Sequence, residues 1–254
     1  MTYVGQARAA LRICYFNGIL PLWRQSTLMI AIFLTPVSFV FFLFVIAPHD
    51  VFAYGVVGGI LFTALFTGNG MLNDCAYYRL ERQLQQVFVA SPVRSTTFVL
   101  GMALSELAFT IPAQALFLTL LWLTRPFGWI ALAGLLGVIL LTWLMATTLG
   151  FMISTFYRQL REIWPVGTMV FSSLSVIPPV FYPIAAIPTR WQWVAFLAPS
   201  TFASQLAGHV VGLSTAHPVG APLLADPGIE LAGLVGATVL FATAAAKLAR
   251  WRER

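Results

Sequence analysis

Residues 129–156, WIALAGLLGVILLTWLMATTLGFMISTF, decide the class of this protein, because they contain no charged side chain. A run of this length crosses a hydrocarbon core of about 30 Å as one helix. The whole chain agrees: 59% of its 254 residues are hydrophobic and 9% are charged, and its mean hydropathy is +0.87. Soluble domains carry about 25% charged residues. We therefore predict an integral membrane protein and exclude most soluble enzymes.

Five further apolar runs are long enough to span a bilayer, so we predict an all-α polytopic protein with six transmembrane helices. No segment between them is long enough for a soluble domain, and residues 1–254 are expected to form one membrane domain. The predicted spans are 27–47, 51–73, 97–123, 129–156, 163–182 and 229–248. The remaining parts are an interfacial helix at 1–26, an outer region at 183–228 and a tail within 229–254.

The segment before the first span has an amphipathic pattern. Val4, Ala7 and Leu11 recur at helical spacing, while Arg8 and Arg12 lie one turn apart on another face. This pattern is typical of a helix in the headgroup layer, although a loosely ordered basic tail is the alternative. The apolar run that follows exceeds a signal-peptide core in length, so we expect it to be retained as a span.

Basic residues predict the orientation, because cytoplasmic loops of membrane proteins are enriched in Lys and Arg. With the N-terminus inside, only Arg125 and Arg190 fall on the outer side. The inner side receives Arg8, Arg12, Arg24, Arg79, Arg82, Arg94, Arg158, Arg161, Lys247, Arg250, Arg252 and Arg254. We expect a multi-pass protein of the inner (plasma) membrane with both termini in the cytoplasm.

Two segments between spans carry the functional signals. Residues 74–95, DCAYYRLERQLQQVFVASPVRS, predict an amphipathic cytoplasmic helix with Asp74 as its N-cap and Pro92 at its end. This helix either lies on the bilayer as a connector or docks on a cytoplasmic partner. Residues 178–212 contain five prolines among apolar residues, which predicts short re-entrant helices in the outer leaflet rather than one helix or an aqueous loop.

Several other chemistries find little support. His49, His209 and His217 are too dispersed for a metal site, and Cys14 and Cys75 are expected to be free thiols. The arginines form no patch interleaved with aromatic residues, so nucleic-acid binding is not expected. The sequence has no G-x-x-x-x-G-K-[ST] motif, and its one lysine is Lys247. ATP, with its Mg²⁺, would therefore have to be bound and hydrolysed by another chain.

These features resemble the ABC-2 type permeases, the membrane subunits of one class of ABC exporters. The resemblance rests on the amphipathic first helix, the six spans, the connector YYRLERQLQQVFVASPVR and the segment FYPIAAIP followed by LAPSTF. It implies a homodimer that pairs with two nucleotide-binding subunits, which bind ATP. It also implies that the connector is the coupling helix that touches those subunits. The coupling residues would be Arg79, Glu81, Arg82, Gln85, Ser91 and Pro92.

We expect the cargo to be amphipathic, since charges inside the spans are few; drugs, lipids, glycolipids and lipid-linked polysaccharides all qualify. The expected outer gate is Phe181, Tyr182 and Pro183. The expected substrate-pathway residues are Thr35, Phe39, Phe66, Thr67, Glu106, Phe171, Ser172 and Ser175, most of which also suit plain packing.

Glu106 supports a rival hypothesis, because it is the acidic residue well inside a predicted span. Charge at that depth costs a few kcal/mol unless it is paired or hydrated. The chain would then be a self-sufficient secondary transporter or channel with Glu106 as its proton or ion site. Such transporters usually show internal repeats, and none is convincing here. A membrane enzyme is the weakest hypothesis, because no cluster of reactive side chains supports it.

Overall fold

The computed structural model describes residues 3–24, 34, 37–38, 41–42, 44–45, 49–81, 92–213 and 226–248. Every regular element in these ranges is helical, which confirms the all-α prediction. The elements are α1 (Tyr3–Cys14), η1 (Tyr15–Ile19), α2 (Leu20–Arg24), α4 (His49–Leu80), α6 (Ser95–Thr124), α7 (Trp129–Ser154), α8 (Leu160–Val176), η2 (Ile184–Ala186), η3 (Thr189–Trp191), α9 (Gln192–Ala195), α10 (Pro199–Val210) and α11 (Pro227–Leu248).

Four of these helices are long and apolar enough to cross a membrane: α4 from Phe52, α6, α7 and α11. The fifth predicted span, 163–182, is wrong in extent, because α8 ends at Val176, just before Pro178 and Pro179. Its 17 residues rise about 25 Å, less than a full hydrocarbon core. The first predicted span, 27–47, lies largely outside the described residues.

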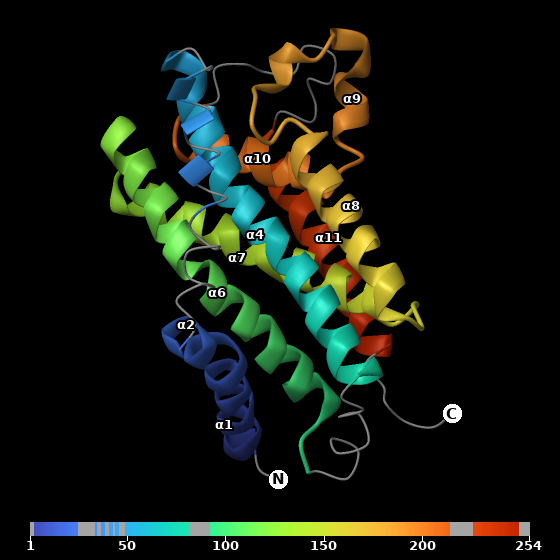
Figure 1. Ribbon diagram of the computed structural model, residues 1–254. Helices are drawn as coiled ribbons and strands as arrows, with labels where there is room; N and C mark the ends of the chain where they lie inside the picture. The colour runs from blue at the N-terminus through green and yellow to red at the C-terminus, as the bar shows by residue number, and fades with distance from the viewer. Residues whose placement is uncertain are drawn as a thin grey trace.

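Helix α4 forms the centre of the bundle, with α6, α7, α8 and α10 packed around it (Figure 1). Its most apolar stretch is 83% buried, against 44% or less in α6, α7 and α11. The main core contains Val56, Ile60 and Leu65 of α4, with Phe117 of α6 and Phe171 of α8. A helix surrounded in this way is apolar on every side, which explains why the sequence shows no amphipathic stripe there.

The backbones of α4 and α7 lie very close together at Gly68 and Gly150. A Cβ atom added to Gly150 would lie 2.1 Å from the carbonyl oxygen of Gly68. No residue larger than glycine fits at this crossing without moving one of the helices. The main helix pair therefore depends on two glycines that are far apart in the sequence.

The predicted N-terminal helix is present as α1, η1 and α2, and it packs along α6. Its packed side includes Gln6, Ala10 and Gly18, which are buried. Val4 and Leu11 lie on the other side and are each 63% exposed. The described residues thus leave Val4, Ala7 and Leu11 uncovered, whereas Gly18, which continues the same stripe, is buried against α6.

Several chain segments meet at one end of the bundle. The start of α1, the end of α4, the start of α6 and the end of α11 all lie there in Figure 1. The short helices η2, η3 and α9 lie at the opposite end. The proline-rich segment is thus folded into short helices, as predicted, with α10 running back against α11 and α7.

We predict that Gly150→Ala destabilises the protein by about 1–3 kcal/mol, because the new methyl group would overlap the α4 backbone. Gly137→Ala is the matched control: it lies in the same helix, and a Cβ atom there meets nothing within 4 Å. Thermal unfolding of the detergent-purified variants measures both effects. Equal midpoints for the two variants would contradict the importance of this crossing.

Candidate transport and coupling sites

The predicted coupling segment begins differently in the structure. Asp74 lies inside α4, which continues without a break to Leu80, so the prediction that Asp74 caps a separate helix is wrong. No proline or glycine interrupts 71–80, so the backbone ladder of α4 continues, and Glu81 N–H still donates to Tyr77 O. Glu81 itself is exposed. The predicted coupling residues Arg82, Gln85 and Ser91 lie outside the described residues.

Arg79 fastens the end of α4 to the end of α7. Its guanidinium donates to the carbonyl oxygens of Ser154 at 2.5 Å and Thr155 at 3.1 Å, and also to that of Tyr157. The last carbonyls of a helix have no partners within the helix, so a charged donor there stabilises the helix end. Arg79 therefore ties α4 to the turn between α7 and α8, and its guanidinium points into the protein.

Gln6 connects α1 to the segment that leads into α6. Its Nε2 donates to Pro92 O at 2.9 Å, and its Oε1 accepts from Arg94 N–H at 3.1 Å and from the Thr97 hydroxyl at 2.7 Å. The amide is buried and uses both ends. Pro92, the last predicted coupling residue, is thereby bound to α1, so a displacement of Pro92 acts directly on this helix.

Glu106 of α6 is buried against α4, and its carboxyl group lies beside that of Asp74. Gly70 makes room for Glu106, since a Cβ atom there would lie 1.8 Å from Glu106 Oε2. The sequence offers no lysine or arginine inside a span to pair with Glu106, and its neighbour Asp74 is found only through the structure.

The predicted pathway residues are divided between surface and core. Phe66 is 38% exposed, and Ser172 is half-buried. Phe171 is completely buried and packs at Gly68, so it is a core residue of this protomer. Thr67 and Ser175 are buried and donate to carbonyl oxygens of their own helices. Thr35 and Phe39 lie outside the described residues.

The predicted outer gate packs on α4. The Phe181 ring lies 6.0 Å from that of Phe62, which stacks on Phe66 at 5.5 Å. The predicted gate and one predicted pathway residue thus share a row of aromatic rings along α4. Tyr182 donates its hydroxyl hydrogen to Ile177 O at 2.7 Å, and Pro183 precedes η2.

Helix α10 is fixed to the end of α8 by two hydroxyl groups. Ser200 donates to Leu174 O and Ser204 donates to Pro179 O, each at 2.6 Å. Both serines are buried. These bonds satisfy carbonyl groups at a helix end that prolines leave without backbone donors. Helix α10 is thereby attached to the segment at the end of α8.

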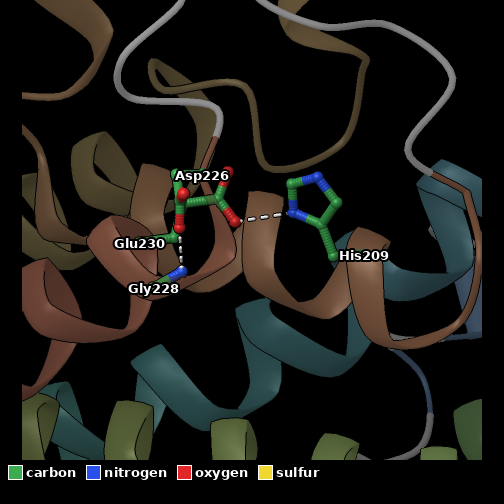
Figure 2. Close-up of polar contacts among 4 residues, drawn as sticks. All are labelled: His209, Asp226, Gly228 and Glu230. Atoms are coloured by element: carbon green, nitrogen blue, oxygen red, sulfur yellow. Dashed lines mark hydrogen bonds and ion pairs between the residues drawn. The ribbon is translucent and has the colours of Figure 1, made fainter.

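A polar contact joins α10 to α11 (Figure 2). His209 Nδ1 lies 2.7 Å from Glu230 Oε2, and Asp226 accepts from Gly228 N–H at 2.6 Å. Burial of the imidazole lowers the pKa of His209, although the Asp226 carboxylate favours its protonated form. A proton on either His209 Nδ1 or Glu230 Oε2 completes the hydrogen bond between them. Within the described residues, no three His, Cys, Asp or Glu side chains gather where they could hold a metal ion.

Apolar helices long enough to cross a membrane, packed around a buried central helix, define a helical membrane domain. The ABC-2 type transporter family matches residues 9–207, most of the chain. The chain belongs to this family and is therefore the permease component of an ABC transporter. No curated protein matches it in sequence.

Gln6→Ala is expected to loosen α1 from α6 at a cost of about 1–3 kcal/mol, because it removes three hydrogen bonds from a buried site. Hydrogen–deuterium exchange of a peptide covering 92–98 should accelerate in this variant. Arg8→Ala, on the exposed side of the same helix, is the control and should leave the exchange unchanged. Unchanged exchange in Gln6→Ala would show that the amide does not hold this junction.

Proposed function

We propose that this permease is the membrane half of an ATP-driven exporter that moves an amphipathic cargo out of the cytoplasm. Two copies of the chain would pair with two separate ATP-binding subunits, which bind ATP and Mg²⁺. The proposal rests on the hydrogen bonds by which Arg79 joins α4 to the turn between α7 and α8. A force applied just beyond Leu80 is thereby transmitted to three helices together.

The connector after α4 is the proposed docking element for the ATP-binding subunit, with Glu81 and Arg82 at its start. Its other end, at Pro92, is bound to α1 through Gln6. Closure of the ATP-binding subunits would push on both ends of the connector and shift α4 and α6 relative to each other. The cargo would then pass along a route between the protomers, past the exposed Phe66, and leave through the outer segment at Phe181, Tyr182 and Pro183.

We predict that Glu81→Ala and Arg82→Ala each reduce ATP-dependent export at least about fivefold, the lower end of ordinary coupling between sites. Binding of the permease to its ATP-binding subunit, measured by co-purification, should weaken in parallel. Glu162→Ala, at an exposed position in the first turn of α8, is the matched loss of a carboxylate and should export normally. Full export by both variants would contradict the assignment of Glu81 and Arg82 as coupling residues.

The neighbouring carboxyl groups of Asp74 and Glu106 support a second candidate function, namely proton-driven transport by the permease alone. We expect Glu106→Gln to preserve ATP-dependent transport, because glutamine fills the same space and its amide can donate to Asp74. The measurement is uptake by proteoliposomes with either ATP and the ATP-binding subunit, or a proton gradient and the permease alone. Transport driven by the gradient and abolished by Glu106→Gln would favour the second function.

A further inference from the structure

A cavity of about 500 Å³ lies between the end of α4 and the start of α8. Its volume is within the range of about 300–1,000 Å³ typical of small-molecule sites. Helix α4 supplies Asn73, Asp74, Tyr77 and Glu81, and α8 supplies Leu160, Arg161 and Trp164. The cavity belongs to the end of the bundle where the proposed coupling connector leaves α4.

The lining combines aromatic faces with oxygen acceptors. Trp164 is 68% exposed, so its indole face is open to a ligand, and Tyr77 lies on the α4 side. Aromatic faces attract cations through the negative potential above the ring. Asp74 and Glu81 add carboxyl groups, and the carboxyl group of Asp74 also lies beside that of Glu106.

The charges of the lining distinguish between ligands of opposite sign. Two carboxyl groups and two aromatic rings favour a positively charged group over a negative one, and Arg161 is the lining side chain that opposes it. Asn73 does not add to this preference, because its Oδ1 is buried away from the cavity surface.

We propose that this cavity is the cytoplasmic binding site for the cargo and that the cargo is an amphipathic organic cation. The aromatic rings and Leu160 hold its apolar part, and the carboxyl groups of Glu81 and Asp74 hold its positive charge. This inference rests on the proposed transport function and adds the charge of the cargo. Binding at the junction of α4 and α8 also places the cargo where the connector's movement would act.

The test uses two probes of the same shape and opposite charge, tetraphenylphosphonium and tetraphenylborate. Equilibrium dialysis in detergent micelles, without ATP, measures the binding of each probe to the full-length permease after subtraction of empty micelles. A defect in coupling cannot imitate a change in this assay. We expect the phosphonium to bind more tightly than the borate.

Variants of the lining residues should change the affinity for the phosphonium and the affinity for the borate in opposite directions. Glu81→Gln and Trp164→Leu are each expected to weaken phosphonium binding about threefold to tenfold, and Arg161→Gln to strengthen it by a similar factor. Glu162→Gln removes a carboxylate beside Arg161 that does not line the cavity, so it should change neither affinity. Asp74→Asn tests the remaining carboxyl group, and circular dichroism and gel filtration check its fold.

Equal affinity for the two probes, or a preference that Glu81→Gln and Arg161→Gln leave unchanged, would overturn the cation site. That result would not affect the proposed export function, which ATP-dependent transport in proteoliposomes tests separately. Conversely, if the permease prefers the phosphonium but transports nothing with ATP, the proposed cation site is supported and the proposed export function is contradicted.

Discussion

The close crossing of α4 and α7 at Gly68 and Gly150 is the constraint on which the rest of the structure depends. With the backbones this near, α4 becomes the helix that the others surround. That position brings Glu106 of α6 against Asp74 and brings Arg79 within reach of the last carbonyls of α7. A protein interior packed to crystal-like density transmits small displacements instead of absorbing them, so α4 is a suitable element for carrying force.

Polar links join the helices at the end of the bundle where the connector leaves and returns. Arg79 holds the departing side of the connector to α7, and Gln6 holds the returning side to α1. Hydrogen bonds with a charged donor are about twice as strong as those between neutral groups. The cavity lies between the end of α4 and the start of α8, close to Arg79, so the proposed binding of cargo and the proposed movement of the connector would involve the same part of α4.

The opposite end of the protein is organised by proline and hydroxyl groups. Prolines end α8 and break the next segment into short helices, and Ser200 and Ser204 then bind carbonyl groups near the end of α8. His209 continues this attachment to α11 through Glu230. Helix α10 is therefore held by side-chain hydrogen bonds to α11 and to the segment at the end of α8, and a shift of α8 would be transmitted to it.

Hydropathy and proline placement in the sequence determined the membrane class, the helical fold, the broken outer segment and the family, because these depend on local composition and order. Sequence reasoning could not find the partner of Glu106 or the role of Arg79, since both contacts join helices through space. It also ended the second span at 73 and began a new helix at Asp74, because a polar run after an apolar one resembles the start of a surface helix when its neighbours are unknown. Only the tertiary structure decided which glycines set the helix spacing: Gly137 meets nothing, whereas Gly150 meets the backbone of Gly68, and a glycine's importance depends on the helix that faces it.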